Sequence, residues 1–241
     1  MTDERFIRTE MMLGLDGLKK LEKSTVMVVG VGAVGGYALE ALARAGVGHL
    51  ILIDFDVFDL SNINRQVLAL TSTVGQKKVA VAQKRVSDIN PKCKVEIEDC
   101  FVTSENINKI LNRKIDFVVD AIDSVKEKCD MMAAMAQKKM NFISAMGAAL
   151  KTDISALKTG KLSETQYCPM AKKIRKDLKN KGIDTSQIIC VYSTEQSDGS
   201  SKPIKPNSDG KKAILGSLPT VTAVMGLMLA HHVILSLSKK E

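Results

Sequence analysis

Glycines and a carboxylate near the start of the chain have the types and spacing of a phosphate-binding site. An apolar run, Val26–Val29, leads directly into the pattern G-x-G-x-x-G at Gly30, Gly32 and Gly35. Glycines let the backbone approach an anion closely, and a following helix N-terminus offers free N–H groups and partial positive charge. Asp54 comes 19 residues after Gly35, where a carboxylate would accept hydrogen bonds from a ribose. The sequence therefore predicts a nucleotide site.

Three further charged residues indicate what is done with the nucleotide. Arg65 and Lys78 are cations that can neutralise a triphosphate, and Asp123 is an additional carboxylate. Magnesium prefers one or two carboxylates together with phosphate oxygens. These residues suit an attack on the α-phosphate of the nucleotide, because they can stabilise the negative charge that develops as pyrophosphate leaves. Taken singly, the two cations would be surface charges and Asp123 a helix N-terminal acid; their occurrence in this order favours a catalytic interpretation.

The glycine pattern and Asp54 alone would also fit a nicotinamide cofactor. The chain offers no obvious partner for hydride transfer, because His49 begins a predicted strand and His231 and His232 lie in an apolar predicted helix. A nicotinamide-dependent enzyme, or a nucleotide-binding regulator without catalysis, stays open as an alternative of lower weight.

The elements that must position these residues alternate between strand and helix through about residue 145. Such alternation predicts an α/β fold: a Rossmann-like, mostly parallel sheet flanked by helices, with the site beyond the carboxyl ends of the strands. The predicted strands are 26–29, 49–53, 94–98, 115–119 and 142–145, and the predicted helices are 35–45, 76–89, 104–112 and 124–139, after a helical lead-in over 1–22.

The remainder of the chain changes character. Strands are predicted over 152–157 and 188–193, a mobile loop rich in Ser, Lys, Pro and Gly over 195–212, and a helix from about Pro219. We expect a single domain, 1–241, with a nucleotide-binding half (1–150) and a substrate-facing half (151–241) that forms a mixed-strand extension. The apolar C-terminal helix is long enough to span a bilayer. Burial in the core is favoured, and peripheral membrane contact is left open.

Composition narrows the partners and the compartment. The formal net charge is +8, and the segment 169–182 alone holds six cations against one carboxylate, Asp177. Such clustering favours a face that binds a polyanion over a diffusely charged surface. The five cysteines include no C-x-x-C pair, which supports neither a disulfide framework nor a zinc site. The charged N-terminus lacks a signal-peptide pattern, so a cytoplasmic protein is expected.

The order of motifs resembles an ATP-dependent activating superfamily, which includes ubiquitin-activating enzymes and the bacterial adenylyltransferases of thiamine and molybdopterin synthesis. The motifs are G-V-G-A-V-G-G, D-F-D, S-N-I-N-R-Q, V-G-Q-K-K-V and D-A-I-D, between about Arg5 and Ile154. The resemblance implies that the glycine loop, Asp54 and Asp56 hold ATP, that Asn62, Arg65 and Lys78 bind its phosphates, and that Asp123 holds Mg²⁺. It also implies a homodimer in which Arg8 reaches the partner's site. Lys77, beside Lys78, leaves one residue of ambiguity.

The second half most resembles the tRNA threonylcarbamoyladenosine dehydratases. The matching pieces are Met146-Gly147-Ala148, the basic stretch from Pro169 to Lys176, Val191–Glu195 and Gly216–Pro219. This resemblance implies ATP-dependent cyclisation of threonylcarbamoyladenosine beside the anticodon. The threonine carboxylate is adenylated with release of pyrophosphate, and AMP leaves as the ring closes. The residues implied in holding tRNA phosphates are Lys172, Lys173, Arg175, Lys176 and Lys179.

Several predictions about function, Cys168 and partners stay open. An adenylyltransferase for a small ubiquitin-like sulfur-carrier protein is the alternative function. Cys168 stands where relatives are expected to carry Asp, and an incidental thiol is favoured over a nucleophile. A monovalent cation in the second half and association with sulfur-transfer proteins are left undecided.

Overall fold

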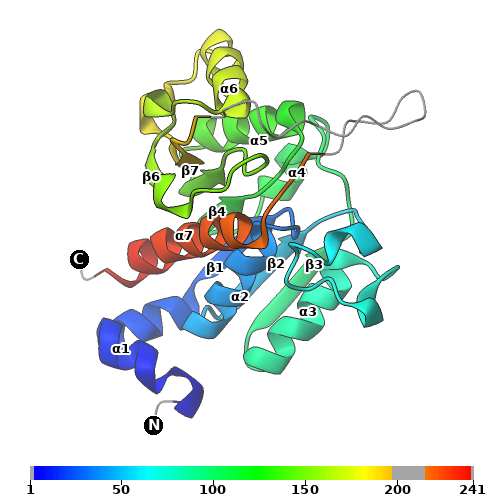
Figure 1. The fold of residues 1–241 in the computed structure, drawn as a ribbon. Coiled ribbons are helices and arrows are strands. Elements are labelled where there is room, and N and C mark those ends of the chain that lie inside the picture. The colour runs from blue at the N-terminus through cyan, green and yellow to red at the C-terminus, as the bar shows by residue number, and fades with distance from the viewer. Residues whose placement is uncertain (1–2, 197–214, 240–241) are drawn as a thin grey trace.

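A seven-stranded sheet runs through both halves of the chain (Figure 1). The structure, a computed structural model, describes residues 3–196 and 215–239. The strands are β1 (Thr25–Val29), β2 (His49–Ile53), β3 (Lys94–Glu98), β4 (Phe117–Asp120), β5 (Phe142–Ala145), β6 (Leu157–Lys161) and β7 (Ile189–Ser193). Their order is β3-β2-β1-β4-β5-β7-β6, and all neighbours are parallel except β6 and β7. The predicted fold class is confirmed.

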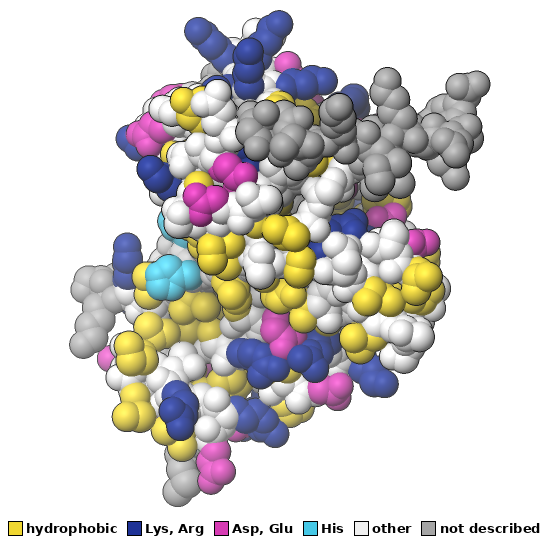
Figure 2. Space-filling model, in the orientation of Figure 1, with side chains coloured by type: hydrophobic (Ala, Val, Ile, Leu, Met, Phe, Trp, Pro, Cys, Tyr) yellow, Lys and Arg dark blue, Asp and Glu magenta, His cyan; other side chains and the backbone are white. Residues whose placement is uncertain are grey.

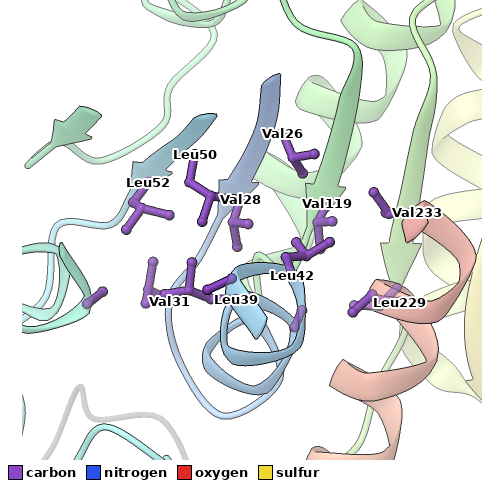
Figure 3. Close-up of a cluster of buried hydrophobic side chains, with 14 of the residues drawn as sticks. Val26, Val28, Val31, Leu39, Leu42, Leu50, Leu52, Val119, Leu229 and Val233 are labelled. Carbon is purple, nitrogen blue, oxygen red and sulfur yellow. The ribbon is translucent and has the colours of Figure 1, made fainter. Parts of the chain in front are cut away.

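Successive strand residues point to opposite faces, so the sheet separates two apolar cores. In β1, Val26 and Val28 join one core, while Met27 and Val29 join the other. Figure 3 shows the first core, in which strand side chains meet Leu39 and Leu42 of the neighbouring helix. That core is covered by α2 (Gly35–Ala45), α3 (Lys78–Ile89) and α7 (Pro219–Ser238), and the other by α4 (Ile107–Leu111), α5 (Val125–Gln137) and α6 (Pro169–Asn180).

The C-terminal helix α7 begins at Pro219, as predicted, and packs directly on α2. A Cβ atom at Gly226 would lie 2.3 Å from the Val34 carbonyl oxygen, so only glycine permits this approach. By length and composition α7 could span a membrane. Here one side is buried, through residues such as Leu229, while Leu227 on the other side is 46% exposed.

The helix α1 (Ile7–Lys23) lies beside α7 and leads into the amino-terminal edge of the sheet. The Phe6 ring, just before α1, lies 3.4 Å from where a Cβ atom of Gly46 would be. Gly46 ends α2 with a left-handed φ of 97° and precedes β2. The N-terminal segment is therefore anchored at the edge of the sheet where the strands begin.

One predicted strand, over 152–157, is wrong in position. Asp153 accepts hydrogen bonds from the N–H and the hydroxyl of Ser155, and this turns the chain into a short 3-10 helix, Ile154–Ala156. The strand β6 follows it, with the sequence Leu-Lys-Thr-Gly-Lys. Because β6 is a polar strand at the edge of the sheet, a search for apolar runs does not find it. Residues 197–212 of the predicted loop lie outside the described residues.

Candidate active site

The candidate site lies where the strand order reverses in the middle of the sheet. From β1 the chain moves to β2 on one side, and β4 lies on the other side. The connection after β1 crosses one face through α2, and the connection after β4 crosses the other through α5. Such a switch point opens a crevice beyond the carboxyl ends of the strands, where ligands bind in open α/β sheets.

Two glycines of the loop after β1 are required by close packing, and the third borders open space. Gly30 has φ of 88°, and a Cβ atom there would lie 2.7 Å from the Ala121 carbonyl oxygen. A Cβ atom at Gly35 would lie only 1.8 Å from the Gly30 oxygen. At Gly32 the nearest atom would be Gln66 Nε2, 4.0 Å away. The loop is therefore a tight turn with an open cradle at Gly32, which fits an anionic group.

The carboxylate of Asp54 is fixed at the end of β2 before any ligand arrives. Its Oδ2 accepts a 2.7 Å hydrogen bond from the Val31 N–H, and its Oδ1 accepts a 2.9 Å bond from the Asp56 N–H. Asp54 is 9% exposed. Each carboxylate oxygen keeps further acceptor capacity, so ribose hydroxyls can still donate to it. The same bonds tie the glycine loop to β2.

The structure distinguishes the two adjacent lysines. Lys78 Nζ lies 2.9 Å from Asp56 Oδ2, and its side chain is 7% exposed. Lys77 turns to Asp99, 3.0 Å away, and is about half exposed. Lys78 thus shares the Asp56 carboxylate at the candidate site, and its ammonium has further protons for a phosphate.

The loop between Asp59 and Gln66 is held largely by its own side chains. Arg65 Nη1 donates to the Ser61 carbonyl at 2.8 Å and to Asn64 Oδ1 at 2.9 Å. Asn62 Oδ1 accepts a 3.3 Å hydrogen bond from the Asp59 N–H. These contacts order the loop around Arg65 without placing an acidic partner on its guanidinium.

Gln66 belongs to the site and is absent from the residues chosen by sequence. It is 7% exposed, and its carboxamide oxygen is buried with no hydrogen-bond partner among the residues that the structure describes. Its Nε2 is the nearest atom to the open side of Gly32. A buried polar group without a partner is costly unless a ligand completes it. The only sequence signal was its place at the end of the S-N-I-N-R-Q motif.

A buried network supports the turn that carries Asp123. Asp120 Oδ2 accepts hydrogen bonds from Lys128 Nζ at 2.8 Å and from the Ser144 hydroxyl at 2.7 Å. Asp120 and Lys128 are both fully buried. Asp120 Oδ1 accepts a bond from the Ile122 N–H at 3.1 Å, which shapes the turn. Asp123 itself is exposed beyond that turn.

The side chains present have the charges and donor atoms needed to hold a nucleoside triphosphate and its metal ion. The glycine cradle and the incomplete Gln66 fit an anionic ligand, and Lys78 supplies positive charge. Asp123 offers one exposed carboxylate, which matches Mg²⁺ held mainly by phosphate oxygens. Among the described residues no group of three or more His, Cys, Asp or Glu side chains could hold a metal ion alone.

Arg8 lies at the opposite edge of the sheet from this crevice. It is exposed, two residues after Phe6, which packs near Gly46 at the start of β2. The glycine loop and Asp54 lie where β1 and β2 end. A five-residue strand spans about 17 Å, more than an arginine side chain reaches. The structure therefore does not bring Arg8 to the site of its own chain.

Lysines of α6 form a basic surface on the substrate-facing half. Lys172, Lys173, Lys176 and Lys179 are exposed. Figure 2 shows dark-blue side chains gathered at the top of the molecule, where Figure 1 places α6. Arg175 differs, because its guanidinium donates to the carbonyl and hydroxyl oxygens of Thr165. Four of the five chosen cations are thus open to a polyanion, and Arg175 is engaged internally.

The cysteines are placed as packed thiols. Cys168 is 5% exposed at the N-terminus of α6, where its sulfur accepts a bond from the Ala171 N–H at 3.5 Å. Sequence reasoning put it outside regular structure, and the structure makes it a helix cap. Burial raises the pKa of Cys190 to about 12 and that of Cys93 to about 11. Such thiols are poor nucleophiles.

Comparisons with known proteins agree with this geometry. The matches cover the second half of the chain as well as the nucleotide motifs. A Bacillus subtilis tRNA threonylcarbamoyladenosine dehydratase is 37% identical, over 98% of this chain and 95% of the relative. The structure of the E. coli enzyme of that name in complex with AMP matches with a TM-score of 0.86 and 34% identity, covering 97% of this chain and 94% of that one.

A second kind of relative matches only part of the chain. A Thermus thermophilus sulfur carrier protein adenylyltransferase is 43% identical over 46% of this chain and 41% of its own length. The profile of the ThiF family matches residues 5–241. The chain belongs to the ThiF family.

Proposed function

We propose that this protein is an ATP-dependent tRNA threonylcarbamoyladenosine dehydratase. The observation that carries the proposal is similarity to dehydratases over nearly the whole chain, including the half that bears the basic helix. The threonine carboxylate of the modified adenosine attacks the α-phosphate of ATP and pyrophosphate leaves. A neighbouring atom of the modification then attacks the activated carboxyl carbon, and AMP departs. The net result is loss of water and closure of a ring.

The chain's own residues bind and orient the reactants in this scheme. Gly30, Gly32 and Gly35 shape the phosphate cradle, and Asp54 accepts hydrogen bonds from the ribose. Asp56, Asn62, Arg65 and Lys78 surround the polyphosphate, with Lys78 and Arg65 stabilising negative charge as pyrophosphate leaves. Asp123 would hold Mg²⁺, which supplies further charge stabilisation when bound.

The Gln66 carboxamide completes the wall beside Gly32. Holding the internal nucleophile close to the activated carboxyl would supply much of the acceleration.

The basic surface of α6 is proposed to hold tRNA phosphates through Lys172, Lys173, Lys176 and Lys179. Arg175 supports this surface from beneath by bonding Thr165, rather than by contacting RNA. Binding through phosphates weakens steeply with salt.

A homodimer is proposed because Arg8 lies too far from the site of its own chain. In a dimer, the N-terminal segment of one protomer can reach the partner's crevice and add a cation there. A cytoplasmic location, a monovalent cation in the second half and association with sulfur-transfer proteins stay predictions.

Pyrophosphate release tests the function directly. The purified protein is incubated with ATP and with tRNA carrying threonylcarbamoyladenosine, isolated from a strain deleted for the enzyme. We expect pyrophosphate release to depend on the modification, and nucleoside mass spectrometry to show loss of 18 mass units, the mass of water, about one per pyrophosphate. Equal release with unmodified tRNA would refute the proposal.

The sulfur-carrier adenylyltransferase is the second candidate, supported by a match over 46% of the chain. It predicts stimulation by a small protein that ends in Gly-Gly and none by tRNA. The same pyrophosphate assay with each substrate in turn separates the two functions.

A further inference from the structure

The turn that precedes α6 presents an exposed aromatic side chain on a strained backbone. Tyr167 has φ of 51°, in the left-handed region that non-glycine residues rarely adopt, and is 53% exposed. Such a conformation costs about 1–3 kcal/mol and persists where the surrounding structure enforces it, often at ligand sites. About half of this residue faces solvent, so packing of the ring offsets the cost only in part.

A buried lysine enforces this conformation. Lys151 is 5% exposed, and its Nζ donates to the main-chain carbonyls of Tyr167, at 3.4 Å, and of Glu195. Its neighbour Leu150 is also left-handed, with φ of 59°, and donates its N–H to the Gly216 carbonyl at 2.9 Å. One ammonium therefore joins three segments that are far apart in sequence and fixes the turn at Tyr167.

The turn lies between the nucleotide crevice and the basic surface of α6. The Cys168 sulfur would contact a Cβ atom on Gly147 at 3.4 Å, and Gly147 follows the end of β5. Because β5 is parallel to β4, this contact is at the same edge of the sheet as the turn that carries Asp123. On its other side, Tyr167 is two residues before Pro169, where α6 begins.

An exposed ring beside a row of cations is the combination that binds unpaired nucleotides. Cations neutralise the phosphates, and the ring stacks on a base that has left the helical stack. We propose that Tyr167 is a stacking platform for a nucleobase of the bound tRNA, close to the nucleotide that undergoes reaction. This inference rests on the proposed function and extends it to a specific contact with RNA. Lys151 then acts as a positioning residue, because it holds the main chain of Tyr167.

Fluorescence can report the contact, because the chain contains no tryptophan. Tyr167→Trp places a single indole at the platform. We expect threonylcarbamoylated tRNA to quench its emission with saturation, at the concentrations that saturate pyrophosphate release. The matched control is Ile97→Trp, at a 38% exposed position of the far edge strand β3, where tRNA should leave the emission unchanged.

Steady-state kinetics gives an independent measurement. Tyr167→Phe should keep the KM for tRNA within about twofold, whereas Tyr167→Ser should raise it about tenfold, since a stacked base contributes roughly 1–3 kcal/mol. The KM for ATP should stay constant in both. Tyr167→Gly relieves the left-handed strain, so it should keep or raise the melting temperature while raising the KM for tRNA. If Tyr167 had only a structural role, the KM for tRNA would not rise in a variant whose melting temperature is kept or raised.

Unchanged KM for tRNA in Tyr167→Ser, or equal quenching in both tryptophan variants, would overturn the platform. Either result with tRNA-dependent pyrophosphate release in the wild type leaves the proposed function intact. If the wild-type protein releases no pyrophosphate in response to the modified tRNA, the proposed function fails instead, and the platform with it.

Discussion

The two halves of the carboxyl edge of the sheet are built in different ways. Beyond β1, β2 and β4, the loops are shaped by contacts between short motifs, such as Asp54 with Val31 and Asp56. Beyond β5 and β7, the loops are joined by contacts across long stretches of chain, such as Lys151 with Glu195. The hydrogen bonds that order the nucleotide loops thus run mainly between nearby motifs, although Asn64 also donates to the Ser217 carbonyl, whereas those of the substrate half run over longer stretches of chain.

This difference suggests a division of labour. A cradle specified mainly by nearby motifs suits a nucleotide, such as the AMP in the structure of the similar E. coli dehydratase, while loops joined at a few points can diverge to fit different acceptors. The partial match to a sulfur carrier protein adenylyltransferase, confined to less than half of the chain, agrees with this interpretation.

The largest expected effect breaks the nucleotide half alone. Asp123→Ala should lower kcat by about 10³-fold, because it removes the carboxylate that would hold Mg²⁺. Affinity for tRNA, measured by filter binding, should stay within about twofold. Asp99→Ala, another exposed acid at this edge, is the control and should keep its activity. Near-normal turnover of Asp123→Ala would remove Asp123 from the mechanism.

Breaking the buried pair tests the support beneath the crevice. Lys128→Met should lower the free energy of unfolding by about 3–5 kcal/mol, because the buried Asp120 carboxylate would lose its cationic partner. Urea denaturation measures the loss. The double variant Asp120→Asn/Lys128→Met leaves no buried charge, so part of the stability should return. Equal stability of the single and double variants would contradict this explanation.

A third change should weaken tRNA binding by the substrate half and leave ATP binding by the glycine loop unchanged. Reversing Lys172, Lys173 and Lys176 to Glu should raise the KM for tRNA about 10–100-fold and flatten its dependence on salt. The KM for ATP should not change. A control that reverses Lys19, Lys23 and Lys84 alters the net charge equally but lies away from α6. The same loss in both variants would reduce the basic surface to an effect of overall charge.

The smallest expected effect lies in the nucleotide-binding half but in the helices α2 and α3 rather than in the loops of the crevice, so it calibrates the other effects. Glu40 joins α2 to α3 through Arg85 and also binds Arg44. Partial burial raises the pKa of Glu40, but the hydrogen bonds from Arg85 and Arg44 outweigh it and hold the pKa below its usual value.

Glu40→Gln should therefore cost about 1 kcal/mol of unfolding free energy at pH 7. A lowered carboxyl pKa stabilises the fold above the unfolded-state pKa, so the cost should vanish as pH falls through the folded-state value. Thermal melts of both proteins from pH 7 to pH 3 would show this. A difference that persists at pH 3 would point to lost packing instead.

Sequence predicted the parts of the molecule whose causes are local. The bounds of α2 and β2 were correct to the residue because a terminal glycine and an apolar run define them, and those of β3 were correct because Val95 and Ile97 alternate with charged residues. The strand β6 was misplaced, since its side chains are polar and only its pairing with β7 makes it a strand. Motif order singled out Asp54 and Lys78, but no local pattern signals the burial of Gln66.

The same limit applies to the network under the site. Asp120 ends an apolar run and Lys128 lies eight residues later, yet their complete burial depends on α5 packing against the sheet. Likewise, only the folded chain shows that Arg175 is turned toward Thr165 while its neighbours face solvent.

The contact between Gly226 and Val34 has a consequence for biosynthesis. Val34 belongs to the glycine loop of the candidate site, and it rests against a helix that comes much later in the chain. During synthesis the nucleotide motifs are made long before the helix that backs them. Competence to use ATP would then wait until α7 has been made and has packed on α2, which would keep earlier intermediates from consuming it.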